Sequence, residues 1–161
     1  MAQKEAANWY FGDKAGLDFN SLTPVALLNG QLNTNEGSAS ISNGDGVLRF
    51  YTDGTTVYNR NHRQMQNGDG LLGNLSSTQS AMIIPVPGNL TKYYIFTVPA
   101  ESAPAGLNYS EVDMTLDGGL GAITANKNIR LDAPFLVSEK ITAVRHTAVS
   151  YTHLRAHETL R

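Results

Sequence analysis

Cysteine is absent from this 161-residue chain, and charged residues make up only 16% of it. The lack of Cys excludes disulfide bonds and thiolate metal ligands, although it leaves the cellular compartment open. No run of residues reaches the roughly 18 apolar positions of a membrane-spanning helix. The formal net charge of −2 is not that of a basic nucleic-acid-binding domain. We therefore expect neither nucleic acid nor membrane insertion.

The sequence is instead rich in turn residues, with 15 Gly, and its clearest pattern is a three-stranded meander. Three short runs of β-branched and aromatic residues are each bounded by Gly, Asn or Asp. Between the last two runs, Asp53-Gly54 predicts a two-residue type I′ hairpin turn. Asn43-Gly44-Asp45-Gly46 predicts the preceding turn. The expected strands are Ser38–Ser42, Val47–Thr52 and Thr55–Asn59.

The opening of this meander recurs further along the chain. Ser38-Ala39-Ser40-Ile41 resembles Ser80-Ala81-Met82-Ile83, about 42 residues later, and Ile141–Val144 begins in a similar way. A period near 40–45 residues is typical of four-stranded propeller blades. We predict an all-β fold, a truncated partial β-propeller of WD40/kelch-like antiparallel blades. Residues 4–147 would form about two blades and the first strand of another.

Further strands are expected on both sides of the central meander. Tyr93–Val98 is apolar at both its odd and its even positions, which predicts a strand covered on both faces. Leu107–Met114 alternates, which predicts an outer or half-exposed strand. Trp9 is predicted as a core anchor in preference to a ligand-stacking residue. The expected strands are Trp9–Phe11, Ala81–Val86, Lys92–Val98, Leu107–Met114 and Ile141–Val144, and Leu17–Asn20 would complete a small hairpin.

Polar and glycine-rich stretches predict the connections. Ser21–Asn35 and Leu116–Ala125 are expected to be loops, and Arg60–Asn74 a surface loop. The NGDG runs at residues 43–46 and 67–70 lack the further acidic ligands of a calcium loop, so we interpret both as tight turns.

The C-terminal segment needs a separate interpretation. Val149–Thr159 resembles the in-frame translation of a transposase-end sequencing adapter, and we assign residues 148–161 to a non-native tail. His153 and His157 stand four residues apart, the spacing of two metal ligands on one helix face. Because that spacing comes from the adapter, we predict no metal site there.

With these strands and turns in view, the chain resembles the N-terminal propeller-like region of large secreted bacterial proteins of gliding motility, which end in a type IX secretion sorting domain. This resemblance implies an exported or cell-surface multidomain protein, and it covers nearly all of Lys4–His146. Activity does not follow from a shared fold. The resemblance rests on Asn8–Gly12, Leu17–Asn20, Phe50–Gly54, Val57–Asn61, Ser77–Ser80, Tyr94–Thr97, Tyr109–Met114 and Glu139–His146.

Two groups of residues have the composition of catalytic sites. Glu111 and Asp113 lie two residues apart on one strand face, as paired acid and base groups could. His62 has the partners of a hydrolytic triad elsewhere in the chain, without a G-x-S-x-G motif. We favour a solvated acidic pair and a loop histidine, and hence no catalytic residues. The candidate triad partners are Asp53, Ser76 and Ser77, and the N-x-[ST] matches at Asn74, Asn89 and Asn108 are interpreted as turn and strand residues.

The remaining candidate is a ligand site at Tyr58, Asn59, Arg60 and Asn61, whose side chains could hydrogen-bond and stack on a sugar. Two functions stay open. The first is a non-catalytic module for adhesion or protein interaction, with surface proteins or glycans as partners. The second is a carbohydrate-binding or carbohydrate-active propeller, either a lectin or a glycosidase. Neither requires a cofactor or a metal.

Overall fold

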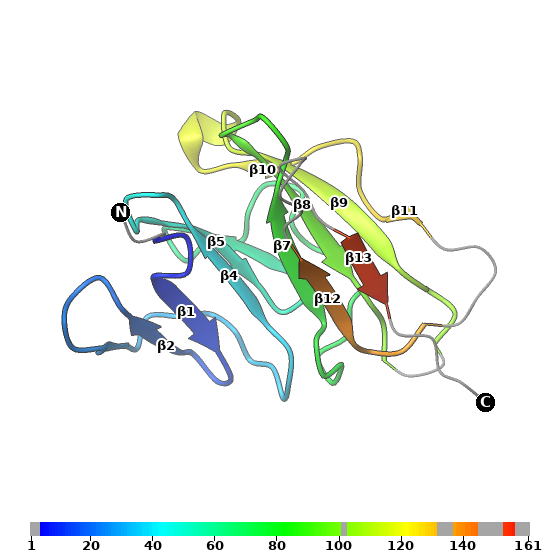
Figure 1. The fold of residues 1–161 in the computed structure, drawn as a ribbon, viewed down its shortest axis with the longest axis horizontal. Helices are drawn as coiled ribbons and strands as arrows, with labels where there is room; N and C mark the ends of the chain where they lie inside the picture. Colours follow the sequence, from blue (N-terminus) through cyan, green and yellow to red (C-terminus); the bar gives the residue numbers. More distant parts are fainter. Residues whose placement is uncertain (1–3, 101–102, 132–136, 145–152, 157–161) are drawn as a thin grey trace.

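A computed structural model describes residues 4–100, 103–131 and 137–144, together with the backbone of 153–156. The described chain is all-β, as expected, with one short 3-10 turn at Asp117–Gly119 (Figure 1). The strands are β1 (Asn8–Phe11), β2 (Ala15–Asp18), β3 (Val25–Leu27), β4 (Ala39–Ser42), β5 (Leu48–Thr52), β6 (Val57–Asn59), β7 (Ala81–Pro85), β8 (Lys92–Thr97), β9 (Asn108–Asp113), β10 (Ala122–Ile123), β11 (Ile129–Arg130), β12 (Ile141–Val144) and β13 (His153–Ala156).

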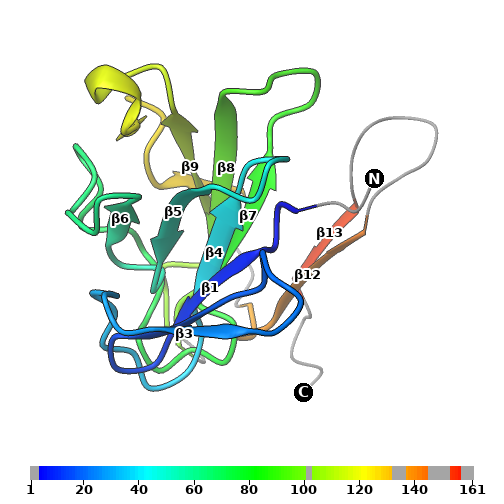
Figure 2. The ribbon, with the colours of Figure 1, turned by 90° about the vertical axis from the view of Figure 1, so that its left-hand side faces the viewer.

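The strands form successive antiparallel meanders. The first sheet has the order β1-β2-β3, the second β4-β5-β6 and the third β10-β9-β8-β7, with β11 also paired to β9. The first strands of the sheets are neighbours: β1 lies against β4, β4 against β7 and β7 against β12 (Figure 2). Within the described residues these sheets do not close into a barrel or a ring.

The main core lies between the second and third sheets. Phe50 on β5 and Tyr93 on β8 meet edge to face, with ring centroids 5.4 Å apart. Both faces contribute apolar side chains, so each sheet covers the face that the other cannot bury alone. The buried members are Ile41, Phe50, Val57, Met65, Leu71, Ala81, Tyr93, Ile95, Val112, Met114 and Ile123.

Serine hydroxyls join the first two sheets along their neighbouring edges. The backbone N–H of Tyr10 on β1 donates to Ser40 Oγ at 2.8 Å, and Ser38 Oγ donates to the carbonyl of Tyr10 at 3.1 Å. These bonds satisfy edge groups of β1 that no strand pairs. The edge of β1 is therefore closed by side chains from β4.

The second and third sheets approach closely at Gly37, just before β4. Its N–H donates to the carbonyl of Ser77 at 3.0 Å. A Cβ atom at this position would clash with the backbone nitrogen of Ser80. Only glycine permits this contact between the two segments that lead into β4 and β7.

The prediction that β8 is covered on both faces is confirmed. Tyr93 and Ile95 face the main core, whereas Phe96 and the following Val98 belong to a second cluster that includes Ile141 of β12. The strand runs through the middle of the third sheet, between β7 and β9. This double burial is why its sequence lacks alternation.

Strand β9 alternates and is half-exposed, as predicted. It is not an outer strand, because β8 flanks it on one side and β10 and β11 on the other. The buried side of β9 also carries polar residues. Asn108 and Ser110 are buried beside Val112, while Tyr109 and Glu111 are partly exposed. Asn108 Nδ2 donates to the carbonyls of Ala105 and Gly106, at 2.8 and 3.0 Å. These bonds offset the cost of burying the amide.

The expected type I′ turn at Asp53-Gly54 is wrong. Thr52 pairs with Val57, so four residues connect β5 to β6, and only Gly54 has a positive φ, at 87°. Asp53 Oδ1 accepts hydrogen bonds from the N–H groups of Thr55 and Thr56, both at 2.8 Å. These side-chain hydrogen bonds stabilise a turn that is longer than the two-residue type I′ turn.

Two stretches predicted as loops also contribute to the core. Met65 and Leu71 in the Arg60–Asn74 loop are buried, so this loop is not confined to the surface. In Leu116–Ala125, Ala122 and Ile123 form the buried β10. Their burial is set by contacts with β5, β8 and β9, which the local sequence does not indicate. Asn67 and Gly70 have positive φ, as tight turns require.

The short strands β3, β10 and β11 were not predicted. β3 and β11 consist of three and two residues and are largely exposed, so they carry no alternating pattern. Their pairing with β2 and β9 defines them. In the described residues, no helix is long and apolar enough to span a membrane.

Strand β13 lies in the segment that we assign to the adapter-derived tail, whose residues 148–152 and 157–161 lie outside the described residues. Its backbone pairs only with β12, as a separate two-stranded sheet. Such a pair is marginal in isolation. We therefore expect deletion of residues 149–161 to change the Tm of the three-sheet core little, measured by circular dichroism. Loss of the cooperative transition on deletion would contradict this.

Candidate functional site

The four predicted ligand-site residues lie at the end of β6 and in the turn that follows. Asn59 is buried, and its Oδ1 accepts hydrogen bonds from the N–H groups of Asn61 and Arg63, at 2.9 and 3.3 Å. Arg60 donates to the carbonyl of Gly119 at 2.6 Å. Tyr58 stacks on Tyr51, with ring centroids 5.5 Å apart. Asn59 and Arg60 thus stabilise loop structure, and the predicted sugar contacts of the group stay a prediction.

A larger polar and aromatic network lies beside this turn, between the first and second sheets. Tyr10 and Tyr51 stack with centroids 4.4 Å apart. His62 lies against both rings, and its Nδ1 is 3.1 Å from the Tyr51 hydroxyl. Its Nε2 is 2.8 Å from Asn29 Nδ2, and the Tyr10 hydroxyl donates to Asn29 Oδ1 at 3.1 Å. No sequence pattern singled out Asn29, which lies in a polar loop.

The hydrogen-bond network suits a neutral His62. With the Asn29 amide nitrogen donating to Nε2, the ring proton lies on Nδ1 and faces the Tyr51 oxygen. The Gln31 N–H also donates to that oxygen at 3.1 Å. Partial burial lowers the pKa of His62 and raises the pKa of Tyr51. The network is therefore built around a neutral imidazole.

Folding stability should depend on pH through His62. Its pKa in the folded chain lies below the ordinary value of 6.5, so the unfolded chain takes up the proton first as the pH falls. We expect stability to be constant above pH 6.5 with respect to this group and to decrease below it. Urea unfolding at a series of pH values measures the effect. His62→Gln should remove this part of the pH dependence, and an unchanged profile in the variant would contradict the assignment.

The candidate triad is not assembled. His62 is bonded to Asn29 and Tyr51, Asp53 Oδ1 caps its own turn, and Ser77 Oγ donates to the carbonyl of Val98 at 3.3 Å. Among the described residues, no hydrogen bond joins His62 to Asp53, Ser76 or Ser77. The histidine contacts neighbouring sheets instead of activating a hydroxyl.

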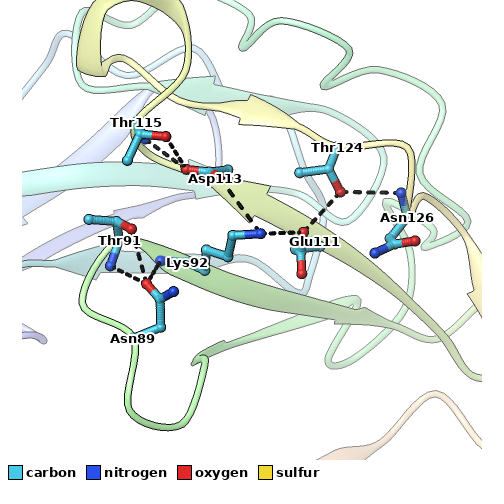
Figure 3. A network of polar contacts seen from close by, with 8 residues as sticks. All are labelled: Asn89, Thr91, Lys92, Glu111, Asp113, Thr115, Thr124 and Asn126. Carbon is cyan, nitrogen blue, oxygen red and sulfur yellow. Dashed lines mark hydrogen bonds and ion pairs between the residues drawn. The ribbon is translucent and has the colours of Figure 1, made fainter.

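The carboxylate pair on β9 is bridged by a cation from β8 (Figure 3). Lys92 Nζ lies 3.1 Å from Glu111 Oε1 and 3.7 Å from Asp113 Oδ2. Thr124 Oγ1 donates to the same Glu111 oxygen at 3.2 Å. The expectation of two freely solvated carboxylates is therefore wrong, because cross-strand pairing places Lys92 opposite Asp113.

These contacts favour the ionised form of Asp113. Hydrogen bonds from the hydroxyl and N–H of Thr115, with a further contribution from Lys92, lower the pKa of Asp113. Its Oδ1 accepts both Thr115 bonds, at 2.7 and 2.9 Å. A general acid must hold a proton near neutral pH. The arrangement therefore suits strand pairing better than proton transfer.

The three N-x-[ST] matches occupy turn and strand positions, in agreement with their interpretation. Asn74 Oδ1 accepts from the Ser76 N–H at 2.9 Å, and Asn89 Oδ1 accepts from the Thr91 N–H at 2.8 Å. Asn108 is buried on β9. The first two side chains cap local turns.

Trp9 is half exposed, at 50%, and the prediction of a core anchor is wrong. The outward-facing side of β1 carries Trp9 and Phe11, which line a cleft of about 290 Å³ with Ser40 of β4 and Ser38 just before it. The inner parity carries Asn8 and Tyr10, so the register of β1 turns the indole outward. Both serine hydroxyls are bonded to Tyr10, which leaves the cleft mainly aromatic.

The described residues contain no group of three His, Asp or Glu side chains that could hold a metal ion. The backbone of His153 lies in strand β13. His157 lies outside the described residues.

Comparison with known proteins gives no relative: no family model, curated protein or solved structure matches the chain.

Proposed function

We propose that this chain is a non-catalytic interaction module of an exported or cell-surface protein, built from propeller-type blades. The observation that carries the proposal is the repeated arrangement of the sheets. Each is a meander whose first strand lies beside the first strand of the next, as in β1, β4 and β7. Radial repetition of such meanders is how propellers are built. The resemblance to gliding-motility proteins supports export, adhesion and secretion by the type IX route.

The contacts of the two potential catalytic groups support the non-catalytic part of the proposal. His62 is held neutral between two sheets, and Glu111 is paired with Lys92. Groups that are fully engaged in strand and sheet contacts are poorly placed to reach a substrate. Binding without turnover is the corresponding activity.

The test combines binding and turnover measurements on the same purified chain. We expect no hydrolysis of chromogenic glycosides and esters, and measurable binding in biolayer interferometry to surface proteins or polysaccharides purified from a gliding bacterium. Glu111→Gln and His62→Gln serve as diagnostic variants. Hydrolysis that either substitution removes would overturn the proposal and favour the glycosidase or another hydrolase.

A further inference from the structure

A second cleft, here called the rim cleft, lies where three separate segments meet. The N-terminal segment contributes Glu5, the β4–β5 hairpin contributes Arg49, and the β7–β8 hairpin contributes Pro85, Leu90 and Tyr93. Its volume is about 260 Å³. Pockets for drug-sized ligands usually enclose about 300–1,000 Å³, so this cleft suits a single small ring.

The position of Arg49 follows from a β-bulge. Ile41 pairs with Phe50 and Ser42 with Leu48, which leaves Arg49 as the extra residue of β5. A bulge of this kind interrupts the alternation of side chains and redirects one of them. Here it brings an arginine to the cleft, beside Tyr93.

The position of Glu5 is fixed through its backbone. The Ser42 N–H donates to the Glu5 carbonyl at 2.7 Å, which ties the N-terminal segment to the end of β4. Asn8 Nδ2 strengthens the same junction, donating to Ser42 Oγ at 3.0 Å and to the Gly46 carbonyl at 2.7 Å. The acid therefore lies on a constrained segment and lines the same cleft as Arg49.

Both charged side chains have buried atoms without a partner. Arg49 Nε and Glu5 Oε2 are inaccessible and make no hydrogen bond to the described residues. No ion pair joins the two side chains within those residues. Burial raises the pKa of Tyr93, Arg49 opposes that rise and Glu5 adds to it, so both charges lie near this hydroxyl. Unpaired buried polar atoms are costly. The two side chains that carry them both line the cleft, where their other polar atoms can meet a ligand.

The chemistry of the lining selects the ligand class. One cation and one anion in the lining largely cancel, so the cleft does not favour a ligand with a net charge of either sign. A sugar hydroxyl both donates and accepts, so neighbouring hydroxyls can accept from Arg49 and donate to Glu5. Pro85, Leu90 and the Tyr93 ring supply apolar surface for the C–H face of the ring. We propose that the rim cleft binds a neutral pyranose, with Arg49 as hydrogen-bond donor and Glu5 as acceptor.

This inference deepens the proposed function, because it names the ligand of a module that binds without catalysis. The probes are the methyl pyranosides of glucose, galactose, mannose and N-acetylglucosamine, titrated into the full chain and followed by amide NMR shifts. We expect at least one probe to shift the amides of Gly44, Leu90 and Tyr93. Arg49→Gln and Glu5→Gln should each weaken binding roughly tenfold or more.

Arg63→Gln is the matched control, because Arg63 is exposed and lies on the β6 turn away from the cleft lining. The Arg63→Gln variant should bind the methyl pyranosides with the same affinity as the unaltered chain. If Arg49→Gln fails to fold, Glu5→Gln tests the same cleft from the constrained N-terminal segment. Unchanged affinity in Glu5→Gln would overturn the inference. So would shifts confined to Trp9 and Phe11, tighter binding of free amino acids, or no binding by any probe. None of these results alters the turnover test, which judges the proposed function separately.

Discussion

Replacing Phe50 with alanine is expected to lower the free energy of unfolding by about 3–5 kcal/mol. The ring is fully buried at the centre of the main core and meets the edge of Tyr93. Its removal leaves a cavity between the second and third sheets, which cannot collapse because both are fixed by backbone pairing. For a domain of this size the loss corresponds to a fall in Tm of roughly 6–20 °C. Thermal and urea unfolding followed by circular dichroism measure it.

Phe11→Ala is the matched control. The Phe11 side chain is partly exposed on the outer parity of β1, so its truncation should cost about 1 kcal/mol or less. Equal losses in the two variants would show that the second and third sheets do not share one core.

The chain should also self-associate, through its open strand edges and through the outer face of its third sheet. Tyr94, Phe96, Tyr109 and Leu131 line a shallow apolar cleft of about 290 Å³ on that face. Leu131 is 49% exposed, and the Tyr94 and Tyr109 rings meet edge to face 5.4 Å apart. In the proposed blade arrangement, the next sheet would cover the part of this face that β12 leaves exposed. An isolated chain should bury it against a second copy, because burial of apolar surface is favourable.

Ile129→Lys combined with Leu131→Lys tests this expectation, since both side chains are exposed and their replacement spares the core. We expect a rise of at least roughly tenfold in the dissociation constant, measured by size-exclusion chromatography with light scattering. Leu22→Lys with Leu28→Lys, two exposed leucines in the segments flanking β3, should leave association unchanged. A monodisperse monomer of 17.4 kDa from the unaltered chain would mean that the third sheet needs no further neighbour, against the propeller arrangement.

The candidate sites show where prediction from sequence stops. Glu111 and Asp113 were correctly placed on one strand face, because that follows from the period of two along a strand. Their pairing with Lys92 depends on the register between β8 and β9. The local sequence patterns of the two strands do not specify that register. The bulge at Arg49 is likewise a feature of pairing, and the sequence around it shows only an ordinary strand. The rim cleft and the Asn29–His62 contact join segments that are far apart in the chain.

The sequence by itself determined the all-β class and the main strands, since turn residues and β-branched runs act locally. It also indicated the double burial of β8, because a strand with two apolar faces needs cover on both. Tertiary structure decided the burial of Met65 and Leu71 and the outward position of Trp9. Each of these features depends on which sheet lies opposite the residue. The packing of whole sheets sets that arrangement, and a single segment of sequence contributes only one of the packed surfaces.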